Sequence, residues 1–347
     1  MSELLLNSLR IENYRSFKNL AIEKLGRVNL IVGKNNVGKT ALLEGLWLYA
    51  NAGYESLMFE ILRERDEIPP FQDGAILVQP ESSRGLRNMF YGRPDLSFMP
   101  TDTPEDLNGG LRFRIGEDID ISGPDPKLMT NTLWAIAHRS GSNDPSSVPS
   151  VQNELKPYRR IPNAFVKANG LTDKKLIEFW DNIEKLVRED LVIEALSIVT
   201  PELRDIRFSG YPNGSFSRVP VVRLEGAKER VPLRSLGEGM TKVLGIASAL
   251  INCESGMLLI DEIEGGLHYT VMLQLWKLIF KTAKDLNAQI FATTHSEDCV
   301  EAFTAAAEES PEDGILIRLE RQGEQIVAKT IEEKRLEIAM KHGVEVR

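Results

Sequence analysis

A glycine-rich segment near the N-terminus holds the residues with the clearest chemistry in this chain. It reads Gly33-Lys34-Asn35-Asn36-Val37-Gly38-Lys39-Thr40 and satisfies the pattern G-x-x-x-x-G-K-[ST] at every fixed position. Successive backbone N–H groups in such a loop form a nest for anions, and the N-terminus of a following helix adds a partial positive charge. We expect Lys39 to reach the β- and γ-phosphates of a nucleoside triphosphate and Thr40 to offer its hydroxyl to Mg²⁺.

The flanking sequence supplies the elements that this chemistry requires. Residues 27–32 form an apolar run that predicts a buried strand, and residues 41–50 predict a helix that begins at Ala41. A chance glycine-rich turn would lack this strand, loop and helix context. The sequence therefore predicts a phosphate-binding loop whose contacts extend to the backbone of Ala41.

A second predicted strand ends in two carboxylates. Residues 257–260 are apolar, and Asp261 and Glu262 follow them directly. Because neighbouring residues of a strand point in opposite directions, one acid can face a metal ion while the next polarises the attacking water. We assign Asp261 to Mg²⁺, through water, and Glu262 to the role of general base.

A third apolar strand, residues 288–293, leads into His295. A lone histidine is more often a packed or surface residue. Placed at a strand end after such a carboxylate pair, however, His295 is expected beside Glu262, where its ring could sense or stabilise the γ-phosphate.

A turn of small residues precedes the predicted helix 236–252. It contains Ser235, Gly237, Glu238 and Gly239. A helix N-terminus lined by small residues binds anions without steric cost, so this turn is a second candidate phosphate contact. The alternative is an ordinary helix cap, with Ser235 as the N-cap and Glu238 as its capping-box partner.

These motifs, in this order, resemble the ABC-type ATPase heads of the SMC, RecF and OLD (overcoming lysogenisation defect) group. The stand-alone OLD-like AAA-family ATPases of prokaryotic defence systems, which lack a Toprim domain, are the most similar members. His268 stands where transporters usually carry aspartate, and Gln79 is only a weak candidate for the Q-loop glutamine. The matching segments are residues 11–17 (N-terminal strand motif), 33–40 (Walker A), 235–239 (signature), 260–268 (Walker B and D-loop) and 294–296 (switch histidine).

The resemblance implies an α/β P-loop NTPase: an ABC-ATPase-like head with a mixed central sheet flanked by helices and an inserted, partly irregular helical lobe. It assigns residues 1–50 and 200–347 to the ATPase core and 51–199 to the insertion, irregular over 51–150 and helical over 171–199. In that group the signature motif of one subunit completes the partner's nucleotide site. This implies a homodimer, or a higher even oligomer, that holds ATP and Mg²⁺ at its interface.

Hydrophobic periodicity predicts the remaining elements. The predicted strands are two within residues 5–23 joined at 14–17, then 74–79, 111–115, 203–208, 219–224, and a hairpin of 314–319 with 325–330; the predicted helices are 267–286, 297–307 and 331–342.

Composition limits the partners. The formal net charge of −9 over 347 residues argues against an overall basic nucleic-acid binder, although the cluster at 156–160 leaves a local contact open. No segment approaches the roughly 18 consecutive apolar residues of a membrane span, and nothing marks the N-terminus for export. We therefore expect a cytoplasmic protein without membrane contact, in which Cys253 and Cys299 are structural thiols.

Two functions compete at this point. The first is an ATPase that switches conformation with ATP and controls a separate effector, a nuclease or toxin, in anti-phage defence. Only about fifty residues follow His295, too few for the Toprim domain of OLD nucleases, so the chain is not expected to cleave DNA itself. The alternative is a RecF- or SMC-like DNA-repair ATPase that binds DNA directly. A transporter subunit is disfavoured by residues 11–17, His268 and the weak Q-loop.

Overall fold

The centre of the molecule is a six-stranded sheet, seen in a computed structural model that describes residues 4–51, 55–68, 87–93, 112–114, 160–210, 218–310 and 313–332. The strand order is β12-β11-β3-β10-β9-β5, and all neighbours are parallel except the β11–β12 hairpin, which confirms the mixed sheet. Their bounds are β3 Val28–Val32, β5 Asn163–Val166, β9 Met257–Ile260, β10 Gln289–Thr293, β11 Gly314–Gln322 and β12 Gln325–Glu332. Because parallel strands end at one edge, the residues that follow β3, β5, β9 and β10 gather there.

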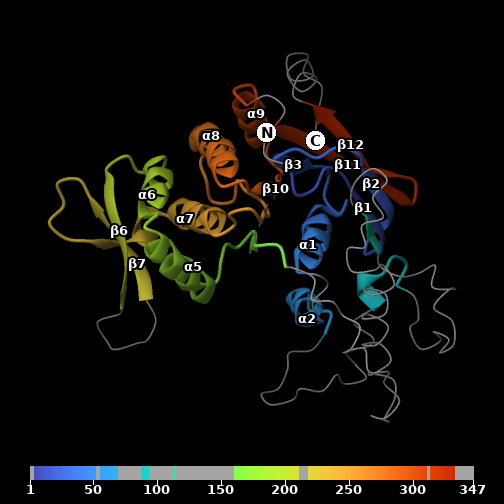
Figure 1. Cartoon of the computed structure of the whole chain (residues 1–347), viewed down its shortest axis with the longest axis horizontal. Coiled ribbons are helices and arrows are strands. Elements are labelled where there is room, and N and C mark those ends of the chain that lie inside the picture. The colour runs from blue at the N-terminus through green and yellow to red at the C-terminus, as the bar shows by residue number, and fades with distance from the viewer. Residues whose placement is uncertain are drawn as a thin grey trace, which may run out of the picture.

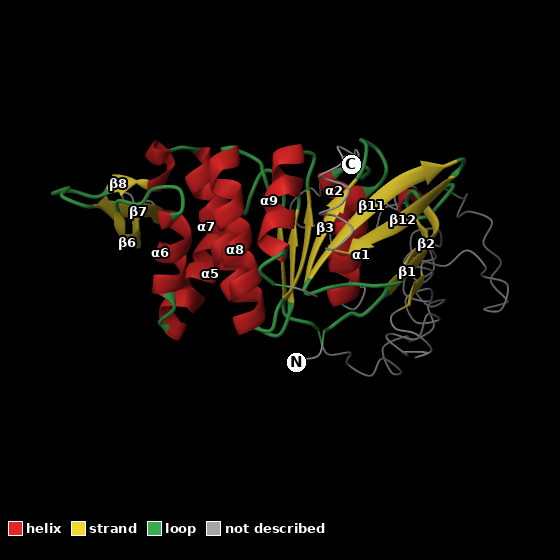
Figure 2. Ribbon diagram, turned by 90° about the horizontal axis from the view of Figure 1, so that it is seen from above, coloured by secondary structure: helices red, strands yellow, loops and turns green. Residues whose placement is uncertain are grey.

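Layers cover both faces of this sheet (Figures 1 and 2). On one face lies α1 (Lys39–Ala50) with a small sheet of β1 (Leu9–Tyr14), β2 (Phe17–Ile22) and β4 (Arg112–Arg114). On the other face lie α7 (Glu238–Ile251), α8 (Tyr269–Asp285) and α9 (Glu297–Ala307). Every residue of β3, β9 and β10 is buried, so the apolar runs in the sequence reflect coverage from both sides.

A third core lies beyond α7. There α5 (Asp173–Leu186), α6 (Glu189–Ser197) and α7 pack against the sheet of β6 (Leu203–Gly210), β7 (Arg218–Leu224) and β8 (Val231–Pro232). The predicted helical stretch 171–199 is divided because Val187, with φ 55°, ends α5 in a left-handed conformation. The aromatic stripe of this stretch is core packing, as Trp180 is buried and stacks on Phe208 at 5.0 Å between ring centroids.

Several expectations for residues 51–199 need correction. The part expected to be irregular contains α2 (Glu55–Glu64), because Leu57, Met58, Ile61 and Leu62 share helical spacing and are buried. The strand β5 lies within the predicted insertion, yet it pairs with β9 as an edge of the central sheet. The expected strand at 111–115 corresponds to β4, whereas the strand at 74–79 and Gln79 lie outside the described residues.

Two further element boundaries differ from the prediction. The helix expected at 331–342 is wrong at its start, because Ile331 pairs with Leu316 in the β11–β12 hairpin; residues 333–342 lie outside the described part. The helix expected from Leu236 begins at Glu238, since residues Leu233–Leu236 form a short 3₁₀ turn. The first difference reflects pairing between two strands and the second a local turn, and hydrophobic periodicity encodes neither.

Candidate nucleotide site

The phosphate loop is fixed by three residues with left-handed backbone conformations. Gly33, Asn36 and Gly38 have φ of 145°, 62° and 93°, and asparagine is among the residues that tolerate this region best. A Cβ on Gly38 would lie 2.6 Å from the Ser16 hydroxyl oxygen and 2.8 Å from Cζ of Phe17. The loop therefore packs tightly on the turn between β1 and β2 while Lys34, Asn35 and Asn36 remain exposed.

Lys39 lies across the loop at the start of α1. Its ammonium donates to the carbonyls of Gly33 at 2.6 Å and Lys34 at 3.1 Å, and the residue is buried. Burial lowers the pKa of Lys39 although Asp261, Glu262 and Glu264 oppose that shift. The structure thus holds a cation within the anion nest, next to the buried backbone of Val37 and Ala41.

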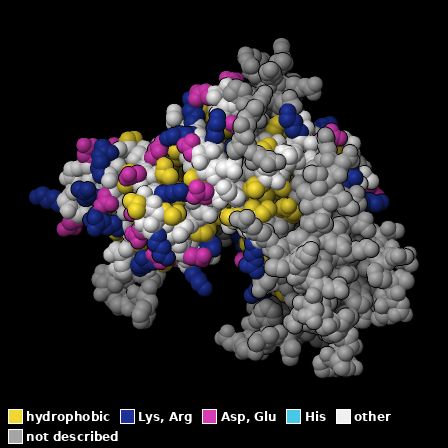
Figure 3. All heavy atoms as spheres, viewed as in Figure 1, with side chains coloured by type: hydrophobic (Ala, Val, Ile, Leu, Met, Phe, Trp, Pro, Cys, Tyr) yellow, Lys and Arg dark blue, Asp and Glu magenta, His cyan; other side chains and the backbone are white. Residues whose placement is uncertain are grey.

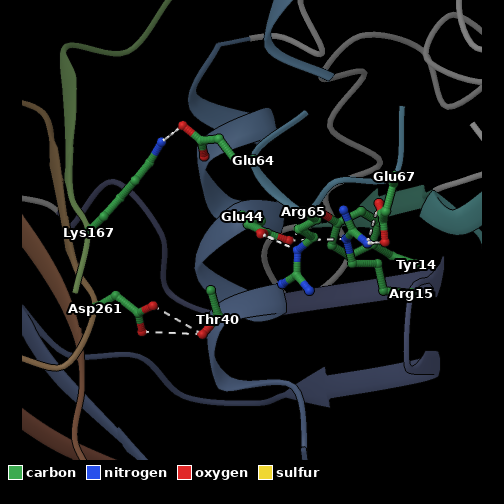
Figure 4. A network of polar contacts seen from close by, with 9 residues as sticks. All are labelled: Tyr14, Arg15, Thr40, Glu44, Glu64, Arg65, Glu67, Lys167 and Asp261. Carbon is green, nitrogen blue, oxygen red and sulfur yellow. Dashed lines mark hydrogen bonds and ion pairs between the residues drawn. The ribbon is translucent and has the colours of Figure 1, made fainter. Parts of the chain in front are cut away.

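Thr40 and Asp261 meet beside the loop. The Thr40 hydroxyl donates to Oδ2 of Asp261 at 3.1 Å (Figure 4), and the Thr293 hydroxyl donates to Oδ1 at 2.6 Å. Oxygen ligands of this kind fit Mg²⁺, which keeps several waters and takes its other ligands from substrate phosphates. Within the described residues no group of three His, Cys, Asp or Glu side chains is placed to hold a metal. Thr40 and Asp261 present oxygen atoms of this kind beside the phosphate loop.

Glu262 and His295 face each other at the open mouth of the site. His295 Nε2 lies 3.8 Å from Oε1 of Glu262, and both side chains are nearly half exposed. The backbone N–H of Glu262 donates to Thr293 Oγ1 at 2.9 Å, and that of His295 donates to Glu264 Oε1 at 2.7 Å. The ends of β9 and β10 thus place a carboxylate and an imidazole where a water could attack a bound phosphate.

The signature turn precedes α7, which covers the opposite face of the sheet from α1 (Figure 2). The alternative prediction of a capping box is wrong. Gly237 is the N-cap of α7 and has no side chain to form a hydrogen bond, and the Ser235 hydroxyl donates to the Pro232 carbonyl at 2.6 Å. Ser235, Gly237 and Glu238 are exposed. Gly239 is required for packing, since a Cβ there would lie 2.8 Å from the Gly266 carbonyl oxygen.

A buried ionic network ties α1 to its neighbours, and motif spacing did not reveal it (Figure 4). Arg15, in the β1–β2 turn, pairs with Glu44 of α1 at 3.1 Å and with Glu67 at 2.9 Å, and Arg65 pairs with Glu44 at 2.7 Å. Burial raises the pKa of Glu44, and the arginines oppose the shift. Since removing one member leaves uncompensated buried charge at a cost of about 3–5 kcal/mol, this network fixes the helix that carries Lys39 and Thr40.

Other residues at the site carried weak signals in the sequence. No sequence motif pointed to Thr293, Glu264 or Lys242. Thr293 and Lys242 donate hydrogen bonds to Asp261, and Glu264 accepts one from the backbone of His295. His268, expected in the D-loop, caps α8, where its Nδ1 lies 2.9 Å from the Thr270 hydroxyl.

The amino-acid sequence of this chain matches a known protein family. A family model described as an AAA ATPase domain matches residues 5–82 and 127–300. The chain belongs to the AAA ATPase domain family. The matched residues include the phosphate loop, the signature turn, both carboxylates and His295, so the protein is an ATPase of this family.

Individual relatives are more distant. The chain is similar to an "ATP/GTP phosphatase" of Helicobacter pylori, with 25% identity covering 86% of this chain and 87% of that protein. A shorter stretch of 43 residues is 46% identical to the DNA replication and repair protein RecF of Clostridioides difficile, covering 12% of each chain. Among solved structures, the SMC head domain from Thermotoga maritima aligns with a TM-score of 0.47 and 12% identity over 94% of this chain and 99% of that one.

Proposed function

We propose that the protein hydrolyses ATP at the interface of a head-to-head homodimer and that ATP-driven closure controls a separate effector. The observation that carries the proposal is the placement of two candidate phosphate-binding features at helices on opposite faces of the sheet. The groups around residues 33–40 lie on the α1 side of the sheet, whereas the signature turn opens α7 on the other side. In a two-fold symmetric dimer, the signature turn of each subunit can contact the nucleotide held by the phosphate loop of the other. Two equivalent sites then form together.

The exposure of the signature turn supports this arrangement. A Cβ at Gly237 would meet no atom within 4 Å, and Ser235 is exposed. The turn leads into α7 with no side-chain cap at its N-terminus, so its first backbone N–H groups are available to an anion. A phosphate of the partner's ATP has the charge and the hydrogen-bond acceptors that such a turn binds.

Each residue of the site has a proposed role in hydrolysis. Lys39 and the loop bind the phosphates, Thr40 and Asp261 hold Mg²⁺, and Mg²⁺ would neutralise charge that develops on the phosphate oxygens. Glu262 takes a proton from the attacking water, and His295 donates to the γ-phosphate. The partner's Ser235–Gly239 turn completes the set only when two subunits meet.

The dimer test uses the Glu262→Gln variant with ATP. Glutamine keeps the shape of glutamate but cannot accept the proton, so ATP should persist and trap the dimer, seen as a doubled mass in light scattering. The matched control is Glu254→Gln, which alters an exposed carboxylate just before β9. A monomeric Glu262→Gln protein that binds ATP would refute the head-to-head site.

Control of an effector is supported by the resemblance to stand-alone OLD-like ATPases, which rests on the Walker A, signature, Walker B and switch-histidine motifs. Within the described residues no helix is both long and apolar enough to cross a membrane. We propose a nuclease or toxin partner in anti-phage defence within the cytoplasm. Copurification from the native host, followed by a nuclease assay of the complex and of the isolated chain, tests this role; nuclease activity of the isolated chain contradicts it.

A direct DNA contact is the second candidate. Its support is the local similarity to RecF and a cleft of about 520 Å³ between α1, α2, β5 and α5 that is lined by Arg160, Lys167, Lys174 and Lys175 but also by Glu60 and Glu178. Where Figure 3 colours the side chains, charges of both signs are interspersed on this face. Duplex binding that weakens steeply with salt would favour this function over effector control.

A further inference from the structure

The buried lysine of the signature helix makes contacts that the proposed reaction has not yet used. Lys242 lies one turn after Gly239 on α7 and is 6% exposed. Its ammonium donates to the carbonyls of Lys167 at 3.1 Å, Ala168 at 3.3 Å and Asp261 at 3.1 Å. Three carbonyls match the three N–H donors of an ammonium, so this cation is satisfied by backbone alone.

One of these carbonyls belongs to the peptide bond between the two catalytic carboxylates. Lys242 holds the C=O of the Asp261–Glu262 peptide, and Thr293 holds its N–H at 2.9 Å. Glu262 follows with φ 48°, a conformation that is costly for a residue with a Cβ. Such a conformation persists only where the surroundings determine it, and here both ends of the preceding peptide are pinned.

The same ammonium also connects separate elements. Lys167, whose carbonyl it holds, lies just after β5 and forms an ion pair through its own side chain with Glu64 at the end of α2 (Figure 4). The chain after Glu262 passes over the ammonium, since a Cβ on Gly265 would be 3.9 Å from Lys242 Nζ. A shift of α7 therefore moves the group that orients the Asp261–Glu262 peptide.

We propose that Lys242 is a positioning residue that sets the conformation of Glu262 and couples it to the signature turn of the same subunit. The inference rests on the proposed dimer, in which that turn contacts the partner's ATP. Binding of ATP in one site then moves α7 and, through Lys242, aligns the general base of the other site. Hydrolysis in the two sites is consequently cooperative.

The test compares Lys242→Met, which keeps the length of the side chain but removes the donors, with Lys242→Arg, which keeps charge and N–H groups. Lys242→Met should lower kcat by about 10- to 100-fold, the cost of misplacing a catalytic group, while KM for ATP changes little. The Hill coefficient for ATP should fall toward one. Lys242→Arg should recover part of kcat and of the cooperativity, and Lys185→Met, an exposed change near the end of α5, should behave as wild type.

The outcomes separate the two proposals. If Glu262→Gln does not dimerise with ATP, the proposed function fails whatever Lys242 does. If Glu262→Gln dimerises but Lys242→Met keeps the wild-type kcat and Hill coefficient, the role of Lys242 is refuted alone. Should Lys242→Met not fold, Lys242→Gln decides, because its amide offers two N–H donors to three carbonyls and carries no charge. A kcat and a Hill coefficient equal to those of the wild type would overturn the coupling.

Discussion

The hydroxyl of Thr40 donates to the carboxylate of Asp261 at 3.1 Å, which joins the end of the phosphate loop to the end of β9. The two residues are 221 positions apart in the sequence, and the parallel order of β3, β10 and β9 brings them together. Both side chains offer oxygen atoms of the kind that would hold Mg²⁺, directly or through its bound water. The contact thus marks where Mg²⁺ would join the loop and the carboxylate strand.

Asp261→Asn should lower the affinity for the Mg²⁺ that the ATPase reaction requires. The amide keeps the volume of the side chain but removes the charge, and its NH₂ group cannot accept from Thr40 or Thr293. We expect ATPase activity at fixed Mg²⁺ to fall by about 10- to 100-fold, with partial recovery at higher Mg²⁺. A Mg²⁺ titration of the rate measures this, with the exposed Asp285→Asn as the control; an unchanged Mg²⁺ dependence would exclude Asp261 from the metal site.

Lys39 should make ATP binding depend on pH in the alkaline range. Burial lowers the pKa of its ammonium below the ordinary 10.5, so the free site loses this proton earlier than a solvated lysine does. Bound phosphate favours the charged form, hence ATP binding takes up a proton and affinity falls as pH rises through the lowered pKa. Calorimetry in two buffers of different ionisation enthalpy measures the uptake, and Lys39→Met should abolish it. Equal heats in both buffers for the wild type would contradict this assignment.

Gly38→Ala should destabilise the fold as well as the nucleotide site. The new Cβ would meet Ser16 at 2.6 Å and would stand at φ 93°. Left-handed strain of about 1–2 kcal/mol and overpacking of about 1–3 kcal/mol both apply. Gly92→Ala separates the two effects, because Gly92 has φ 73° but no atom within 4 Å of its Cβ position. Urea unfolding should show a clearly larger loss for Gly38→Ala; equal losses would mean that the loop does not pack on the β1–β2 turn.

The two cysteines should be inert in the native protein. Cys253 and Cys299 are both buried, and burial raises the pKa of each thiol to about 12. Because the thiolate is the reactive form, a disulfide reagent such as Ellman's should label neither at pH 8 and both after unfolding. Fast labelling of the native protein would show that the core they share opens readily.

Motif spacing was sufficient to predict the phosphate loop, Asp261, Glu262 and His295 as one cluster, since each follows an apolar strand and parallel strands end together. The edge strand β5 was missed because Asn163–Val166 has only four residues and alternates buried with half-buried positions. Lys242 was missed for a different reason: its partners are backbone carbonyls, which every residue has. Long-range contacts of that kind leave no pattern in a single sequence.

The most direct test of the shared site mixes two inactive variants. Lys39→Met removes the phosphate contact of one subunit, and Ser235→Arg blocks the signature turn of the other. If each nucleotide lies between two subunits, a mixed dimer retains one intact site. An equimolar mixture should therefore be more active than either variant alone and reach at most about a quarter of the wild-type ATPase rate, the limit for two sites that act independently. If the mixture is no more active than the two variants measured alone, the phosphate loop and the signature turn do not meet across a dimer.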